Sequence, residues 1–291
     1  MPEGVAEPAP LSGIGVVTLA VNVPGPAAAS RLRAFGATVT KVEPSGGDPL
    51  AHFSPAWYES LASGQEVRRL DLKAAGGREE LATLLDGADL LLTSSRPASL
   101  ARLGLSWEEL HAEYPRLSQV AIVGNPSPRA DEPGHDLTYL AGWGLLSPPD
   151  LPRTLTADLA GAERAVSAAL GLLLGRERGL GPGYSEVALS EAAEAFAEPL
   201  VHGLTSPGGV LGGETAGYGL YRASEGWIAV AALEKHFLGK LLSELGLEKA
   251  DRGGLEAVFA EHPAHWWEEW AAARGLPIVA LREAPPGHPT A

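Results

Sequence analysis

The stretch "GIGVVTLAVNVPGPAAASRLRAFGATVTKVE" (residues 13–43) contains the pattern that decides the fold. Its first part, "GIGVVTLAV", is short and apolar, as a buried strand is. "GPAAASRLRAFG" follows with good helix formers and ends at Gly36, a residue that commonly closes a helix. "ATVTKVE" then gives a second strand. A strand, a helix and another strand in this order predict a β-α-β unit with parallel strands.

The same alternation continues along the chain. Further strands are expected at "DLLLTSS" (89–95), "LSQVAIVG" (117–124) and "YSEVALS" (184–190), and helical segments separate them. Strands that are apolar without interruption belong to a parallel sheet that is covered on both faces. We therefore expect a large α/β domain over residues 11–188, with a doubly wound, mostly parallel, Rossmann-like sheet. Residues 1–10 are expected to form a disordered tail.

A helix and a glycine-rich loop over residues 189–212 are expected to link this domain to a smaller one, which occupies residues 213–291 and ends early at its C-terminus. "LYRASEGWIAVAAL" (220–233) predicts a hairpin that turns at Glu225 and Gly226. Helices are expected near 235–246, 254–261 and 264–274. The smaller domain is therefore predicted to be α+β.

Composition excludes several classes of function. Asp and Glu outnumber Lys and Arg by 36 to 22, for a formal net charge of −14. Such a surface repels nucleic acid and anionic membranes, so neither is an expected partner. There is no cysteine, which excludes thiolate chemistry and cysteine-based zinc sites. No metal is expected, because "EHPAHWWEEW" (261–270) is read as an amphipathic helix. The N-terminus is unlike a signal peptide, and we expect a cytoplasmic protein.

Three residues stand out as candidates for acid–base chemistry: His135, Asp158 and Glu234. Asp158 immediately precedes a long apolar helix, so it is either an ordinary N-cap or a proton carrier beside the positive end of that helix. His135 comes where a Pro- and Gly-rich loop runs into the interior, and taken alone it would be an ordinary histidine. Glu234 follows a predicted strand, where a glutamate usually begins a helix.

The order of motifs resembles the family III CoA transferases, the CaiB/BaiF superfamily, from about residue 10 to residue 281. The motifs that carry the resemblance are "PLSGIGVVTLA", "GP", "LDLK", "SRPASLARLGLSWEEL", "YPRLSQVAIVG", "GHDLTYLAGWGLLS", the Asp158 segment and "YRASEGWIAVAALEKHF". Within the family the chain is most similar to the α-methylacyl-CoA racemases. Those racemases carry Gly-His-Asp where this chain has "GHD" (134–136), and a glutamate where it has Glu234.

The racemase resemblance implies an isomerase that epimerises the α-carbon of 2-methylacyl-CoA thioesters by proton transfer through an enolate. It implies that His135, supported by Glu234, serves one face of the substrate and that Asp158 serves the other. No cofactor is expected, because coenzyme A is part of the acyl-CoA substrate. The resemblance also implies a homodimer.

The resemblance assigns the CoA phosphates to Arg96, Lys41 and Arg102, which stand at family positions. The family's basic Asn-Arg-x-Lys segment is replaced by "ASGQEVRRLDLK" (62–73), where Arg68 is the expected substitute. The chain ends about where the family's polypeptide returns to its large domain. Interlocking of the two subunits is therefore left open.

Two alternatives to the racemase remain. A CoA transferase of the family would use the Asp158 carboxylate as a nucleophile and would require an acceptor acid. A catalytically silent relative would bind acyl-CoA and do no chemistry. The replaced basic segment favours the silent relative, whereas retention of His135, Asp158 and Glu234 favours an enzyme.

Overall fold

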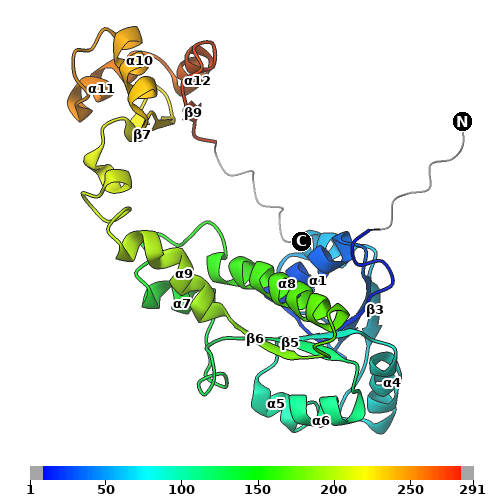
Figure 1. Cartoon of the computed structure of the whole chain (residues 1–291). Coiled ribbons are helices and arrows are strands. Elements are labelled where there is room, and N and C mark those ends of the chain that lie inside the picture. Colours follow the sequence, from blue (N-terminus) through cyan, green and yellow to red (C-terminus); the bar gives the residue numbers. More distant parts are fainter. Residues whose placement is uncertain (1–8, 283–291) are drawn as a thin grey trace, which may run out of the picture. The chain divides into compact units, whose positions relative to one another are not determined.

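The computed structural model describes residues 9–282 and contains two compact units, with the boundary between Ala197 and Glu198 (Figure 1). The sequence predicts a large domain that ends at residue 188, a linker over residues 189–212 and a small domain from residue 213. The helix that follows, α9 (Leu189–Val201), begins in the first unit because Leu189 and Ala193 are buried in that unit's core. Each unit is described by itself below.

The first unit is built on a six-stranded parallel sheet in the order β3-β2-β1-β4-β5-β6. This order confirms the predicted doubly wound α/β fold, because the chain starts at the centre and winds outward twice. The strands are β1 (Gly15–Thr18), β2 (Thr38–Glu43), β3 (Glu66–Arg69), β4 (Leu90–Thr93), β5 (Ser118–Val123) and β6 (Tyr184–Ala188).

Helices cover both faces of this sheet (Figure 1). The first unit contains α1 (Pro24–Ala34), α2 (Leu50–Phe53), α3 (Pro55–Ala62), α4 (Ala75–Asp86), α5 (Pro97–Ala101), α6 (Trp107–Glu113), α7 (Asp136–Gly142) and α8 (Thr156–Glu177). One face carries α1 and α8, which share a core with Val16, Val120 and Ile122. The other face carries α4, α5 and α6.

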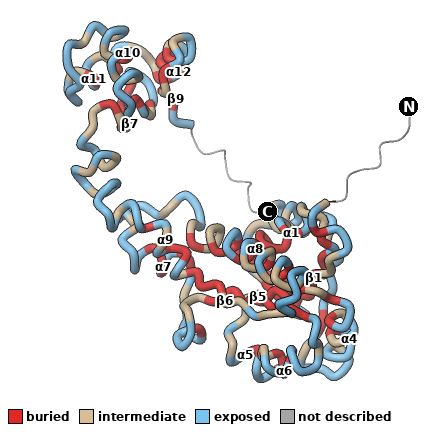
Figure 2. Tube along the Cα trace, viewed as in Figure 1, coloured by how far each residue is buried: buried red, intermediate tan, exposed pale blue. Residues whose placement is uncertain are grey.

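The central strands form where the sequence is apolar on both sides. Leu90, Leu91 and Leu92 of β4 are each fully buried, and they face the two cores alternately. Figure 2 shows in red the buried stretches of the sheet, such as β5. Strand β3 differs, because all four residues of "EVRR" are exposed. Its pairing with β2 makes it a strand. The apolar pattern that predicts the other strands is therefore missing there.

Two successive connections pass over opposite faces of the sheet. The chain reaches β5 from β4 through α5 and α6, and it reaches β6 from β5 through α8 on the other face. Residues alternate in direction along a strand, so Gln119, Tyr184 and Glu186 point away from α8. The connection from β5 to β6 places no helix over these three side chains.

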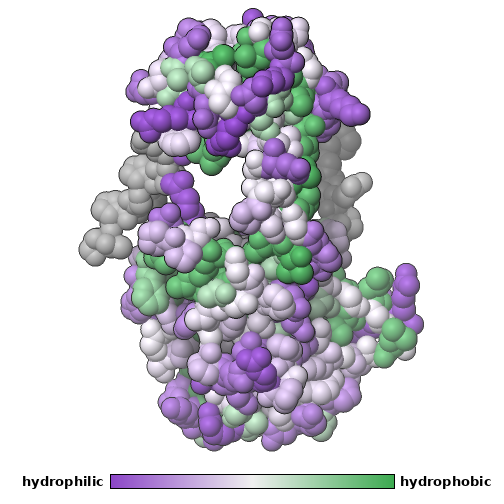
Figure 3. All heavy atoms as spheres, turned by 90° about the vertical axis from the view of Figure 1, so that its left-hand side faces the viewer, coloured by the Kyte–Doolittle hydropathy of each residue, from purple (hydrophilic) through white to green (hydrophobic). Residues whose placement is uncertain are grey.

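The second unit has its own sheet and its own core. Its antiparallel strands β7 (Tyr218–Arg222), β8 (Trp227–Ala231) and β9 (Ile278–Ala280) lie in the order β7-β8-β9. Helices α10 (Lys235–Leu245), α11 (Arg252–Phe259) and α12 (Ala264–Ala272) pack on them, and η1 (Val210–Glu214) precedes them. Gly226 turns the predicted hairpin with φ of 80°. Leu220 and Val279 are exposed hydrophobic residues of this unit. Figure 3 shows hydrophobic surface, in green, on both units.

The predicted disordered tail falls outside the described residues except for Ala9 and Pro10. These two residues belong to a turn in which the Ser12 N–H donates to the Ala9 carbonyl at 2.9 Å. The end of the predicted small domain, residues 283–291, also lies outside the description. Within residues 9–282, no helix combines the length and the apolar character that crossing a membrane requires.

Candidate active site

A small pocket lies at the carboxyl ends of β1, β4 and β5, where Val21, Asn22, Ser94 and Gly124 follow the strands. The strand order reverses between β1 and β4, and ligands of doubly wound sheets bind at this reversal. The pocket measures about 100 Å³. Its lining comprises Val21, Asn22, Pro24, Ser94, Ile122, Val123, Gly124, His135, Tyr139, Asp158 and Leu189.

His135 lines this pocket but does not enter the interior. It is the N-cap of α7 and is exposed, whereas its neighbour Asp136 is buried. The His135 N–H donates to Thr138 Oγ1 at 3.0 Å, and that hydroxyl donates to the His135 carbonyl at 2.8 Å. The expectation that His135 is the residue carried inward is therefore wrong. Its ring is left at the mouth of the pocket, where a substrate can reach it.

Asp158 lines the same pocket and lies in the first turn of α8. The helix begins at Thr156 with Leu155 as its N-cap, so the interpretation of Asp158 as an N-cap is wrong. The Asp158 side chain does not cap the helix, because Asp136 accepts a hydrogen bond from the first turn of α8 instead. The Asp158 backbone N–H donates to Asp136 Oδ1 at 3.1 Å.

Burial and the neighbouring Asp136 determine the pKa of Asp158. Asp136 is 4% exposed, and its Oδ2 has no hydrogen-bond partner among the described residues. The pKa of Asp158 is raised to about 6, chiefly by burial and then by the negative charge of Asp136, while His135 opposes the shift. A carboxyl with such a pKa both takes up and releases a proton near neutral pH.

Tyr139 forms a wall of the pocket, and its position explains why two nearby residues are glycines. It is 7% exposed, and its hydroxyl lies against the backbone of Gly124 and Gly134, where an added Cβ would collide with it. Burial and the nearby Asp158 raise the pKa of Tyr139, and Arg96 lowers it. Sequence reasoning missed both Tyr139 and Asp136 as site residues. The helical spacing of 135 and 139 could have indicated Tyr139.

A larger cavity of about 520 Å³ adjoins the small pocket and shares Val21 with it. Ser95 lines the larger cavity and Ser94 the smaller one, so a long ligand could pass across the ends of β1 and β4. The volume is within the range of cofactor sites. Its residues are Leu19, Val21, Val42, Glu43, Pro44, Ser45, Gly46, Leu70, Asp71, Leu72, Lys73, Ser95, Leu100 and Leu103.

Lys41 is not available to a phosphate, which corrects the expectation. It is fully buried, and its Nζ lies 2.7 Å from Glu43 Oε1 and 2.6 Å from Asp48 Oδ2. Asp48 Oδ1 accepts the backbone N–H of Asn22 at 2.9 Å. Lys41 therefore supports the loop that lines the pocket.

The remaining cations differ in availability. Arg96 is exposed at the N-terminus of α5 and makes no ion pair with a carboxylate of the described residues. Arg102 is exposed and donates to Ser99 Oγ at 3.0 Å. The Arg68 guanidinium lies 2.5 Å from the carboxylate of Glu66 in β3 and 3.4 Å from that of Glu80 in α4. Lys73, which the phosphate prediction did not include, is exposed and lines the larger cavity.

Comparison with known proteins decides the family. The family model described as CoA-transferase family III matches residues 11–284. The chain belongs to CoA-transferase family III. This confirms the resemblance seen in the order of motifs, and the pocket at the carboxyl edge lies within the matched residues.

Curated relatives in the family include both kinds of enzyme. A subunit of succinyl-CoA:(R)-benzylsuccinate CoA-transferase of Thauera aromatica is 32% identical over 72% of this chain and 57% of its own. α-Methylacyl-CoA racemase of Homo sapiens is 31% identical over 82% of this chain and 65% of its own. The chain thus spans less than two thirds of the length of these two relatives.

Solved structures share the fold of this family III chain. A hypothetical protein of Mycobacterium tuberculosis has a TM-score of 0.83 at 24% identity, covering 94% of this chain and 86% of its own. A CaiB/BaiF family protein of Brucella suis has a TM-score of 0.80 at 22% identity, covering 95% of this chain and 85% of its own. At these identities the likeness supports the fold alone.

Glu234 lies in the second unit, where it is the N-cap of α10. Its expected support of His135, which lies in the first unit, stays a prediction. Over residues 9–282, no group of three or more His, Asp or Glu side chains is placed to hold a metal ion.

Proposed function

We propose that this family III protein epimerises the α-carbon of 2-methylacyl-CoA thioesters. One observation carries the proposal: His135 and Asp158 line one pocket, and the pKa of Asp158 is raised to about 6. An imidazole and a carboxyl that line the same pocket can act as paired acid and base, one removing a proton and the other returning it.

The chemistry requires no cofactor beyond the CoA of the substrate. The thioester carbonyl makes the α C–H acidic, and one base removes that proton to give an enolate. The protonated group on the opposite face then donates a proton to the α-carbon, which inverts its configuration. In this proposal His135 serves one face with the support of Glu234, and Asp158 serves the other.

The substrate would lie across the carboxyl edge of the sheet. The larger cavity would take the nucleotide end, with Lys73 beside it and Arg96 exposed near Tyr139. The pantetheine arm would pass Val21 and Ser95, and the acyl group would end in the smaller pocket. With a net charge of −14, the protein depends on these few cations to hold an anionic ligand.

CoA transfer is the second candidate, because several curated relatives are named as CoA-transferases. In that reaction the Asp158 carboxylate would attack the thioester and would have to be ionised. With a pKa of about 6 this carboxyl is mostly ionised at pH 7 and is able to attack, but His135 would have no step to perform in that reaction. The presence of His135 in the same pocket favours proton transfer.

Deuterium exchange tests the proposal. In heavy water, the wild-type protein should place deuterium at the α-carbon of either epimer of a 2-methylacyl-CoA without any added acid. His135→Ala and Asp158→Asn should each slow epimerisation by about 10²–10⁴-fold, as loss of a positioned acid–base group does. The matched controls His265→Ala and Glu79→Gln change exposed residues outside the pocket and should leave the rate unchanged.

A transferase would instead require an acceptor acid and would tolerate His135→Ala. Wild-type protein that binds acyl-CoA but incorporates no deuterium would contradict the proposal. A protein that binds acyl-CoA but neither exchanges the α-proton nor transfers CoA would be the silent relative.

A further inference from the structure

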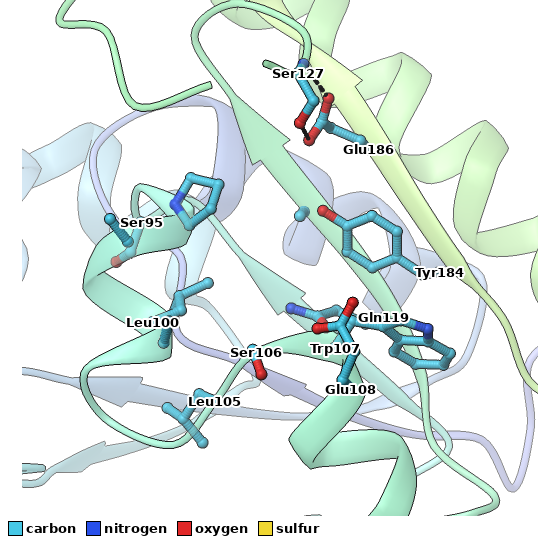
Figure 4. A pocket seen from close by; sticks show the side chains of 14 residues that line it. Ser95, Leu100, Leu105, Ser106, Trp107, Glu108, Gln119, Ser127, Tyr184 and Glu186 are labelled. Carbon is cyan, nitrogen blue, oxygen red and sulfur yellow. Dashed lines mark hydrogen bonds between the residues drawn. The ribbon is translucent and has the colours of Figure 1, made fainter. Parts of the chain in front are cut away.

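A separate cavity of about 440 Å³ lies on the face of the sheet opposite α8 (Figure 4). It opens over β5 and β6 because the connection between these strands places its helix on the other face. It shares Ser95 and Leu100 with the large cavity at the carboxyl edge. Its residues are Ser95, Pro97, Ala98, Leu100, Ala101, Leu105, Ser106, Trp107, Glu108, Gln119, Ala121, Ser127, Tyr184 and Glu186.

Gln119 lies in the floor of this cavity. It occupies the middle of the sheet, where its register partners are Leu91 and Tyr184, and it is 2% exposed. Its Oε1 has no hydrogen-bond partner among the described residues. Figure 4 shows its carboxamide among the side chains of Trp107 and Glu108. This oxygen is closed to solvent, so Gln119 contributes a nearly covered carboxamide to the floor of the cavity.

Aromatic and aliphatic side chains form the walls. The rings of Trp107 and Tyr184 are 5.8 Å apart and inclined by 34°. Leu100 and Leu105 lie across the cavity from them (Figure 4). Aromatic faces attract cations, and the aliphatic wall suits a short apolar body.

The charged side chains that line the cavity are all negative. Glu108 and Glu186 contribute carboxylates, and none of the described residues that line the cavity is Lys or Arg. Glu186 accepts hydrogen bonds from the Ser127 N–H at 2.8 Å and from its Oγ at 2.9 Å, which fixes the carboxylate beside the cavity. An anion such as a CoA phosphate would be repelled here.

We propose that this cavity binds a small organic cation, an ammonium or guanidinium group on a short apolar body. The cation lies against Trp107 and Tyr184 near the carboxylates of Glu108 and Glu186. The cavity shares only Ser95 and Leu100 with the larger cavity at the carboxyl edge. Binding of the cation does not depend on the proposed function, whereas its expected independence from CoA does.

Calorimetry on the full chain tests it with three probes of one shape. 2-Phenylethylamine is a cation, 2-phenylethanol is neutral and phenylacetate is an anion. The amine should bind one to one and about tenfold more tightly than the alcohol, which is the scale of a cation–aromatic contact with nearby carboxylates. Phenylacetate should not bind. CoA at saturation should leave amine binding unchanged, since the phosphates belong at the carboxyl edge.

Variants locate the site. Glu108→Gln and Trp107→Leu should each weaken amine binding by about tenfold. Glu191→Gln removes an exposed carboxylate outside the cavity and is the control. Glu108 is exposed as well, so that variant is expected to fold, and thermal unfolding checks all of them. The proposal is wrong if the amine does not bind, if the alcohol binds equally well, or if Glu108→Gln has no effect. Displacement of the amine by CoA would instead contradict the proposed placement of CoA.

Discussion

At the scale of residues, the segment "GHDLTY" (134–139) gives each polar position a separate task. Gly134 leaves room for the Tyr139 hydroxyl, His135 stays at the mouth of the pocket, and Asp136 turns inward to accept the N–H of Asp158. Burial, and after it the charge of the neighbouring Asp136, raises the pKa of the proposed proton carrier Asp158. The site therefore contains two carboxyl groups with different roles, one structural and one for chemistry.

Asp158→Asn should make the protein more stable at pH 7. The pKa of Asp158 is raised from 3.8 to about 6 in the folded state, so its favourable contribution is complete below pH 3.8 and is lost as the pH rises through 6. Removing the charge should recover about 1–3 kcal/mol at pH 7 and little at pH 4. Urea unfolding at the two pH values measures this difference. The exposed control Glu79→Gln should change neither value, and a less stable Asp158→Asn at pH 7 would show that the buried charge does not destabilise the fold.

At the scale of elements, the strand β2 and the loop after β1 are joined through buried charge. Asn22 has φ of 69° and is the one non-glycine residue with a positive φ in residues 9–282. The Asn22 backbone N–H donates to Asp48 Oδ1, and the Lys41 ammonium of β2 donates to Asp48 Oδ2. Tyr58 donates to Glu43 at 2.6 Å and completes the network. A strand that was expected to present a lysine to substrate instead fixes the shape of the substrate loop.

Lys41→Met should lower the free energy of unfolding by about 3–5 kcal/mol, because it leaves the carboxylates of Glu43 and Asp48 buried without their cation. Arg68→Met, on the exposed edge strand β3, should cost less than about 1 kcal/mol. Urea unfolding measures both. If Lys41→Met instead keeps its stability and loses acyl-CoA affinity, the lysine binds phosphate and the structural role is wrong.

At the scale of the whole molecule, the two units differ in how their hydrophobic cores are built. The first unit has a core on each face of its sheet. The second has one core, in which Tyr221, Phe259 and Trp267 pack together, and the Trp267 indole N–H donates to the Phe259 carbonyl at 2.9 Å. The homodimer implied by the family resemblance stays a prediction, and light scattering on the full chain tests it.

The segment from Glu198 to the end of the chain should fold when it is expressed alone, because its core is complete within the unit. Two-dimensional NMR should show dispersed amide signals, and unfolding should be cooperative. Trp267→Ala should cost about 3–5 kcal/mol by cavity formation and loss of the indole hydrogen bond, whereas the exposed His265→Ala should cost little. A collapsed, poorly dispersed spectrum of the isolated segment would show that it needs the rest of the chain.

The sequence alone determined the local structure of this protein and its family. Apolar strands separated by helices predicted the parallel sheet, because a strand buried on both faces must be apolar along its whole length. The hairpin followed from the turn at Glu225 and Gly226, since turn chemistry is local. The order of motifs indicated CoA-transferase family III. His135 and Asp158 could be selected as candidates from those motifs, and the structure places both in one pocket.

Tertiary structure decided the rest, because it depends on partners far away in sequence. Strand β3 exists through pairing with β2, although its own residues are exposed and charged. Burial of Lys41 needs two carboxylates, and the choice of Asp136 over His135 for the interior needs the N-terminus of α8. The face taken by α8 left Gln119 beneath an open cavity. A sequence pattern specifies which side chains can be buried, but only long-range packing selects which of them are, since each buried polar group must find its own partner.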